Sequence, residues 1–146
     1  MNKRNLTKMK NVNIFIKSRA STENDCDESE FFTEGTLEQT ADGIKLSYEE
    51  NAQIGFENSR VSVTAADDKV VIERTGAASS VLFIEKGKKH CCVYGTPYGD
   101  FTVGTHAYEI NCGLSEDGGT LEFKYSVDVN SEFISENELR LIVTVS

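Results

Sequence analysis

The sequence has no tryptophan, one proline and two histidines, and it contains no long run of apolar residues. A helix that spans a membrane needs about 20 consecutive apolar residues, and no segment approaches that length. The basic start, which includes Lys3 and Arg4, is not followed by the roughly 7 to 15 apolar residues of a secretory signal core. The apolar stretch from Val12 to Ile16 is interrupted by Asn13 and ends at Lys17. We therefore expect a cytoplasmic protein without a membrane span.

Cysteine and histidine occur in no arrangement that is typical of a metal site or of an activated nucleophile. The four cysteines include no Cys-x-x-Cys pair, and in a reducing compartment they are expected to be free thiols. Cys91 and Cys92 are adjacent in a strand-like segment, so their side chains point to opposite faces and cannot share one zinc ion. His90 and His106 bring no third group that would orient a Cys–His pair, and His106 is expected to be exposed. We predict no metal, no cofactor and no assignable catalytic residue.

The acidic segment from Ala20 to Ser29 is expected to be a solvated loop rather than a calcium site. An EF-hand loop needs glycine at its sixth position and glutamate at its twelfth. Counting from Asp25 gives Glu30 and Thr36 at these two positions. The segment therefore lacks the layout that binds calcium.

The formal net charge of -9 and the sequence pI of about 4.7 indicate an acidic, well-solvated protein. Its 146 residues are the size of one domain, which we assign to residues 1–146 with a flexible tail over residues 1–11. The negative charge opposes binding to the phosphate backbone of nucleic acids and to anionic membrane surfaces. We expect neither nucleic acid nor membrane as a partner, and the oligomeric state stays open.

The segment from Leu121 to Val129 has an apolar residue at every odd position and a polar or charged residue at every even position. Successive side chains of a strand point to opposite sides, so this alternation predicts a strand with one buried and one solvated face. Ile44, Leu46 and Tyr48 alternate with polar residues in the same way, and so do the apolar residues at the end of the chain.

Short strands of this kind recur along the chain and are separated by turn residues, with no amphipathic helix between them. The strands are expected over residues 12–19, 30–38, 44–49, 53–65, 69–75, 81–85, 90–94, 101–110, 119–129 and 139–145. Residues 86–89 are expected to close a hairpin, and residues 130–136 to form a loop. Because parallel pairing needs long crossover connections, the sheet is expected to be antiparallel. We predict an all-β fold, a single closed antiparallel up-and-down β-barrel of about eight to ten strands, in preference to a sandwich.

A family resemblance supports the barrel. It is carried by Ile72-x-Arg74-x-Gly76, Gly87, Tyr94-x-Thr96-Pro97-Tyr98-Gly99, Val103-x-Thr105, Tyr125 and Asn137-x-Leu139, together with Leu46-Ser47-Tyr48-Glu49. From about Val12 onward the chain resembles the YwiB-like family of small bacterial proteins. The resemblance implies a calycin-type, lipocalin-like β-barrel in the cytoplasm, and it brings no established activity, substrate or catalytic residue. The chain lacks the Gly-x-Trp mark of true lipocalins, so its likeness to those proteins is architectural only.

Arg74 is the first candidate for a ligand-binding residue. It continues the even-numbered series of Val70 and Ile72, which predicts that its side chain faces inward near one mouth of the barrel. A buried guanidinium needs a carboxylate partner or an anionic ligand. Arg74 is therefore interpreted either as an anchor for a ligand carboxylate or phosphate, or as half of an internal ion pair.

Tyr94, Tyr98 and Thr105 are the other candidates, since they are expected to cluster around the Pro97 corner at the barrel mouth. Their hydroxyls are suited to bind the polar end of a ligand. In the alternative interpretation the two rings plug the barrel and their hydroxyls reach water.

Three functional hypotheses follow from these residues. The first is a non-enzymatic barrel that binds a small amphipathic or apolar molecule. In one version of this hypothesis the molecule is anionic. The second is an interaction or regulatory module with a filled barrel, whose outer face or acidic segment meets a protein partner. The third is an enzyme at the barrel mouth, with Arg74 binding substrate and Tyr98 acting as acid or base.

Overall fold

The computed structural model describes residues 9–50, 58–76, 80–96 and 99–146, and the regular elements within these ranges are all strands. The strands are β1 (Lys10–Ser21), β2 (Cys26–Thr40), β3 (Gly43–Glu49), β4 (Ser59–Ala65), β5 (Lys69–Gly76), β6 (Ser80–Glu85), β7 (Lys89–Thr96), β8 (Gly99–Ser115), β9 (Gly118–Val129) and β10 (Glu132–Val145). Among these residues no helix is long and apolar enough to cross a membrane.

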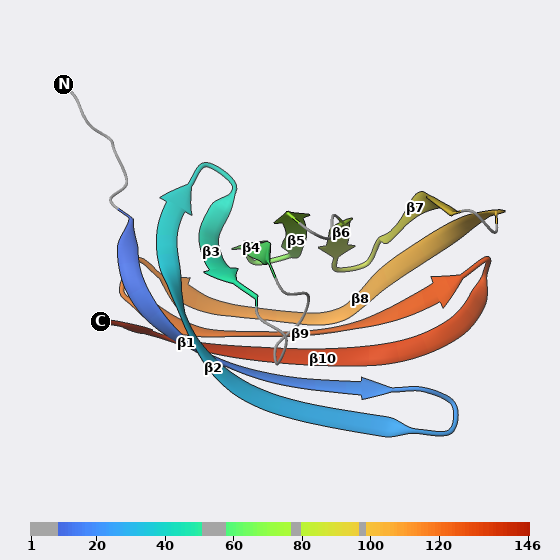
Figure 1. The fold of residues 1–146 in the computed structure, drawn as a ribbon, viewed down its shortest axis with the longest axis horizontal. Helices are drawn as coiled ribbons and strands as arrows, with labels where there is room; N and C mark the ends of the chain where they lie inside the picture. The colour runs from blue at the N-terminus through green and yellow to red at the C-terminus, as the bar shows by residue number, and fades with distance from the viewer. Residues whose placement is uncertain (1–8, 51–57, 77–79, 97–98) are drawn as a thin grey trace.

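The strands form one antiparallel sheet that curls into a nearly closed up-and-down barrel (Figure 1). The order of the ten strands is β6-β5-β4-β3-β2-β1-β10-β9-β8-β7. The first and last strands are therefore neighbours in the middle of the sheet, with Val12 opposite Val145 and Ser21 opposite Glu136. Every other neighbouring pair is consecutive in sequence, which confirms the predicted all-β barrel with hairpin connections.

The two ends of the sheet, β6 and β7, meet at a seam where the ladder of backbone hydrogen bonds is interrupted. The predicted hairpin between these two strands is wrong, because β7 pairs with β8 and not with β6. A bridge joins Glu85 to Lys88 just before β7 begins, and His90 of β7 contacts Glu85 through its side chain. The neighbour of β6 across the seam is β8. Thr105 Oγ1 donates a hydrogen bond of 2.7 Å to the carbonyl oxygen of Phe83, and Lys86 forms a bridge with Ala107.

Two segments expected to be loops are largely strand. The acidic segment 20–29 contains only a short turn, in which the Thr22 N–H donates to the Asp25 carbonyl oxygen at 2.8 Å, before β2 begins at Cys26. Segment 130–136 contains a turn at Asn130 and Ser131, which have positive φ angles of 51° and 70°, before β10 begins. Acidic composition suggested solvent exposure correctly and loop structure wrongly. Both faces of β2 are exposed at its beginning, so Asp27 and Glu28, which point to opposite faces, are both solvated.

Two of the expected segments, the strand 53–65 and the tail 1–11, lie partly outside the described residues. The beginning of the predicted strand 53–65 lies outside the described residues, and β4 covers its second half. Residues 1–8 of the predicted tail also lie outside the described residues, whereas Lys10 and Asn11 are already paired in β1.

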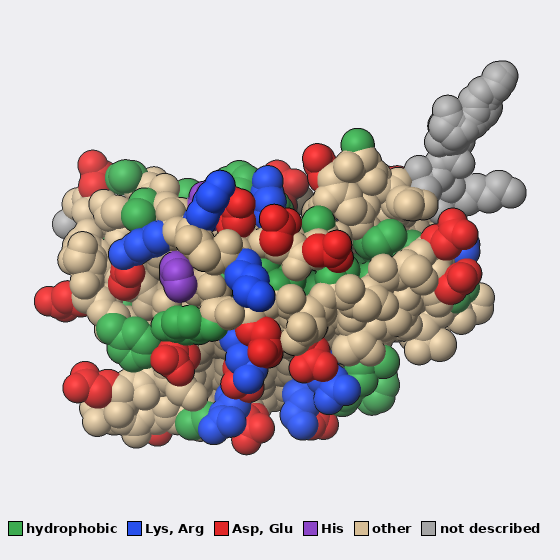
Figure 2. Space-filling view, turned by 180° about the vertical axis from the view of Figure 1, so that it is seen from behind, with side chains coloured by type: hydrophobic (Ala, Val, Ile, Leu, Met, Phe, Trp, Pro, Cys, Tyr) green, Lys and Arg blue, Asp and Glu red, His purple; other side chains and the backbone are tan. Residues whose placement is uncertain are grey.

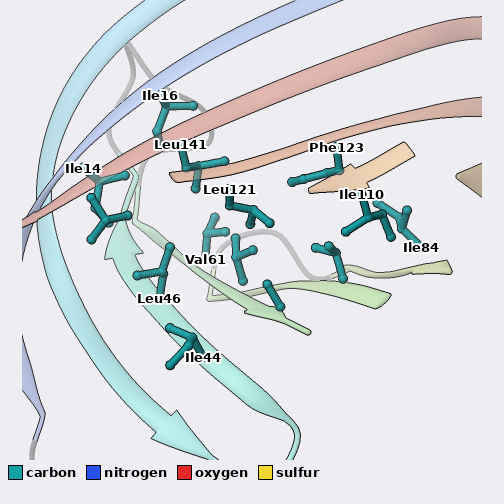
Figure 3. Packing of buried hydrophobic residues seen from close by; sticks show 14 of the residues in the cluster. Ile14, Ile16, Ile44, Leu46, Val61, Ile84, Ile110, Leu121, Phe123 and Leu141 are labelled. Atoms are coloured by element: carbon teal, nitrogen blue, oxygen red, sulfur yellow. The ribbon is translucent and has the colours of Figure 1, made fainter. Parts of the chain in front are cut away.

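Alternate side chains of the strands form one apolar core inside the barrel (Figure 3). In β9, Leu121, Phe123 and Tyr125 are 0%, 1% and 8% exposed, which confirms the alternation predicted from the sequence. Ile44 and Leu46 of β3 are buried, as their even-numbered series predicted. The largest fully buried side chains are Phe123, Ile14, Leu37, Leu46, Ile84, Leu121, Leu141, Val12, Val61 and Val70.

Charged side chains on the outer face alternate in sign across neighbouring strands. Lys124 Nζ lies 3.9 Å from a carboxylate oxygen of Glu109 and 3.6 Å from one of Glu138. In the same row Glu138 is opposite Arg19, and Arg19 is opposite Glu28. Figure 2 shows acidic and basic side chains interspersed on one face of the molecule. Exposed pairs contribute about 0.2–1 kcal/mol each to the free energy of unfolding. These rows of charges therefore favour one register of strand pairing more than they stabilise the fold.

Candidate functional site

A bidentate ion pair between Arg74 and Glu50 interrupts the apolar inner wall. Arg74 Nε donates to Glu50 Oε1 at 2.7 Å, and Arg74 Nη2 donates to Glu50 Oε2 at 3.1 Å. The Glu50 side chain is 2% exposed and that of Arg74 is 27% exposed. The acid is thus enclosed by protein, while part of the Arg74 side chain remains accessible.

The facing of both residues follows from strand alternation. Glu50 comes two residues after Tyr48 in the inward series of β3, and its N–H continues the ladder by donating to the Ser59 carbonyl oxygen at 2.8 Å. Arg74 follows Val70 and Ile72 in β5, and it confirms the inward facing predicted for this series. Because β4 lies between β3 and β5, the two long side chains meet on the interior side of β4.

The hydrogen bonds to Glu50 raise the pKa of Arg74 above its ordinary value, against a smaller opposing effect of burial. The guanidinium is therefore charged at every physiological pH. A charged pair in an apolar wall is tolerated because the guanidinium donates a hydrogen bond to each oxygen of the buried carboxylate.

Two tyrosines border the ion pair. Burial raises the pKa of Tyr48 to about 12, the negative charge of Glu50 adds to the effect, and Arg74 opposes it. Burial also raises the pKa of Tyr125, again opposed by Arg74. The ring of Tyr125 stacks on Phe123 with centroids 5.9 Å apart. The site therefore combines one charge pair, two neutral phenols and aromatic surface.

Two open grooves lie beside Glu50. The first, of about 460 Å³, is lined by Glu49, Glu50, Asn58, Ser59, Arg60, Thr75 and Gly76. The second, of about 500 Å³, is lined by Thr33, Glu34, Gly35, Thr36, Ser47, Tyr48, Glu49, Glu50 and Arg60. Both grooves are open to solvent and lined mainly by polar residues, unlike the mostly apolar concavities that usually hold small molecules.

Of the four sequence candidates the structure describes the side chains of Arg74 and Thr105, and the expected cluster of Tyr94, Tyr98 and Thr105 stays a prediction. Thr105 is 3% exposed and its hydroxyl binds the Phe83 carbonyl oxygen at the seam. Thr105 is opposite His90, whereas Tyr94 is opposite Phe101. Four residues of strand separate Thr105 from Phe101, about 13 Å along β8. Tyr98 lies outside the described residues.

Sequence reasoning missed Glu50, Tyr48 and Tyr125 as members of this site. The alternation that placed Ile44 and Leu46 inward extends through Tyr48 to Glu50, so the signal was present. It was obscured because Glu50 follows another glutamate and resembles the start of a polar loop. Tyr125 was identified as a residue of the buried face of its strand and as part of the family resemblance, but not as a site residue.

The histidines and cysteines lie apart from this site. His90 Nε2 is 3.0 Å from Glu85 Oε1 at the seam, and half-buried His106 packs edge-on against Tyr108 with ring centroids 5.5 Å apart. Within the described ranges no three His, Cys, Asp or Glu side chains are grouped as metal ligands. Cys26 is exposed, and a hydrogen bond of 3.1 Å from Arg19 Nε lowers the pKa of its thiol.

The strand order and the largely apolar interior define the class of this protein, which is a small all-β, nearly closed antiparallel up-and-down barrel. The family model described as "Domain of unknown function (DUF1934)" matches residues 14–141, and the chain belongs to this family.

The crystal structure of the ywiB protein from Bacillus subtilis is similar to this fold, with a TM-score of 0.80 and 20% sequence identity. The similarity covers 97% of this chain and 96% of that chain. The resemblance to YwiB-like barrels that the sequence suggested is thereby confirmed. No curated protein in the comparison matches this chain.

Proposed function

We propose that this protein is a cytoplasmic binding barrel for a small amphipathic molecule. The polar end of the ligand is held by the Arg74–Glu50 pair, and its apolar part enters the mouth of the barrel beside this pair. The observation that carries the proposal is the partly buried bidentate ion pair, with a 2.7 Å Arg74–Glu50 hydrogen bond, in a largely apolar interior.

The composition of the interior supports this function. Small-molecule sites are mostly apolar concavities that contain a few well-placed polar groups. The Arg74 side chain is 27% exposed, so a ligand oxygen can approach it while Glu50 remains bound. Because Glu50 already balances the charge of Arg74, we expect neutral alcohols and amides to bind with affinities similar to those of singly charged carboxylates.

Native mass spectrometry of the protein purified without denaturation tests the proposal. We expect a bound small molecule, together with a saturable rise in melting temperature when decanoate, decanol or 2-naphthoate is added. Absence of both a co-purified molecule and a thermal shift contradicts the proposal.

A pair of matched variants locates the site. Arg74→Gln is expected to weaken binding of the most effective probe at least tenfold, whereas Arg140→Gln is the control, since Arg140 lies on the outer face 3.6 Å from Glu122. If Arg74→Gln lowers stability and leaves probe affinity unchanged, Arg74 is structural and the polar anchor lies elsewhere.

A second candidate function is the binding of a protein partner by the outer surface. It is favoured by large apolar side chains that are more than half exposed, among them Phe32 at 77%, Val93 at 67% and Phe133 at 53%. No nucleic acid or membrane is proposed as a partner, because the net charge is -9.

A further inference from the structure

The first part of β2 has a neighbouring strand on one side only. Its pairing with β1 covers Cys26 to Leu37, whereas its pairing with β3 begins at Gly35. Among the described residues, no strand pairs with the segment from Cys26 to Glu34 on the side away from β1. Figure 1 shows this part of β2 at the lower margin of the molecule, beyond the end of β3.

An edge of this kind presents backbone N–H and C=O groups that are not used within the sheet. Proteins usually shorten such edges, cover them or place charges on them, because an open edge accepts another strand. The free part of β2 is extended and follows β1 without an irregularity in register. It is therefore geometrically ready for strand addition.

The side chains of this edge define the chemistry of the strand that fits it. On the outer face β2 carries Glu28, Glu30 and Phe32, and Phe32 is 77% exposed. On the paired side of β2, β1 places a complementary side chain opposite each of these three residues. Arg19 is opposite Glu28, Lys17 is opposite Glu30 at 3.7 Å, and Phe15 is opposite Phe32 with ring centroids 4.6 Å apart.

We propose that the free edge of β2, from Cys26 to Glu34, binds an extended segment of another protein by strand addition. The segment runs antiparallel to β2 and presents, on one face, an aromatic or aliphatic residue followed by basic residues two and four positions later. Its backbone pairs with β2, its basic side chains meet Glu30 and Glu28, and its apolar residue packs on Phe32.

A second copy of this chain is the less favourable occupant. The edge carries Asp27, Glu28, Glu30 and Glu34 and no basic residue. Pairing of two β2 edges would set carboxylates against carboxylates, and like charges directly opposite each other destabilise a strand pair. The charge of the edge therefore selects a basic partner.

A synthetic peptide provides the direct test. The probe has the sequence of residues 13–21, Asn-Ile-Phe-Ile-Lys-Ser-Arg-Ala-Ser, because this segment already complements β2 within the sheet. Fluorescence anisotropy is expected to show saturable binding that weakens with added salt. A control peptide with Lys17→Glu and Arg19→Glu is expected to bind at least tenfold more weakly. Equal binding of the two peptides overturns the proposal.

Amide hydrogen exchange of the complex locates the bound peptide. The expected result is slower exchange in the Cys26–Glu34 segment, with exchange in β1 unchanged. Faster exchange in β1 would mean that the peptide displaces β1. Protection confined to other strands would mean that the peptide binds at another site. Either result contradicts the proposal. Protection of this segment without peptide, together with a dimer in light scattering, would make a second copy the occupant.

Charge-reversal variants of the full protein complete the experiment. The double variant Glu28→Lys with Glu30→Lys is expected to lose at least tenfold in affinity for the basic peptide and to gain affinity for the acidic control peptide. Asp42→Lys with Asp67→Lys makes the same change in net charge at two exposed turn residues and is expected to leave both affinities within about twofold. Equal effects of the two double variants would show a general charge effect and overturn the proposal.

Discussion

At the scale of single residues, the Arg74–Glu50 pair shows how a charged side chain is held in a small barrel. The Glu50 carboxylate is almost completely enclosed and receives two hydrogen bonds from one guanidinium. Desolvation of the two charges costs free energy that their attraction offsets only while both partners are present. The pair is therefore a specific polar feature of the interior more than a source of net stability.

Removal of one partner is expected to destabilise the protein more than removal of both. Arg74→Met leaves Glu50 buried without a counter-charge and should lower the free energy of unfolding by about 3 kcal/mol. Arg74→Met combined with Glu50→Leu should recover most of this loss, because no buried charge remains. Urea unfolding at neutral pH measures both changes. Equal losses in the single and double variants would contradict this account of the pair.

Tyr48 is expected to make stability depend on pH in the alkaline range. Its pKa is about 12 in the folded protein against 10.0 for an unperturbed tyrosine, so the unfolded chain ionises first. The contribution of Tyr48 is fully present below pH 10 and is lost as the pH rises toward 12, by up to roughly 2–3 kcal/mol. Tyr48→Phe should flatten the decline in urea stability between pH 9.5 and 11. Tyr108→Phe, at a tyrosine that is 52% exposed, should leave the decline unchanged.

At the scale of elements, the seam is the place where side chains replace a ladder of backbone hydrogen bonds. Thr105 binds the Phe83 carbonyl oxygen, and His90 binds Glu85, whose pKa this hydrogen bond lowers. Few contacts of this kind make a boundary weaker than a paired strand interface. The seam is therefore expected to be the first part of the barrel to open.

Thr105→Val tests the role of the seam while preserving side-chain volume. Loss of the 2.7 Å hydrogen bond to Phe83 should cost about 1 kcal/mol of local stability. Amide hydrogen exchange should become about fivefold faster in β6, while β1 and β10 keep their protection. Thr102→Val, at an exposed position of the same strand, is the control. Unchanged exchange in β6 would show that other contacts close the seam.

Particular elements show which part of the fold the sequence predicts. The alternation in β9 and β3 is local, so the buried faces of Leu121 to Val129 and of Ile44 to Tyr48 could be predicted from neighbouring residues alone. The partner of a strand is not local. The position of the seam and the pairing of Arg74 with Glu50 depend on register across several strands, which no short pattern contains. In the acidic segment, Glu28 is opposite Arg19 of β1, a cross-strand pair that the local sequence does not reveal.

At the scale of the whole molecule, the pairing of the first strand with the last makes the barrel a continuous wall apart from one seam. Ten strands in this order surround an apolar interior, with charges interspersed on the outer face and the Arg74–Glu50 ion pair on the inner one. The inner wall and the free edge of β2 are separate surfaces. A small ligand inside and an extended protein segment outside can therefore be tested independently.

The central claim, that the interior binds an amphipathic molecule through Arg74 and Glu50, is tested most directly by nuclear magnetic resonance. Uniformly ¹⁵N-labelled protein is titrated with decanol and, separately, with decanoate. The account predicts saturable shifts of the Arg74 Nε–H signal and of the amides of Tyr48 and Tyr125, with the amides of outer-face residues such as Lys124 unaffected. An unchanged Arg74 Nε–H signal, or non-saturable shifts spread over the outer face, would contradict it.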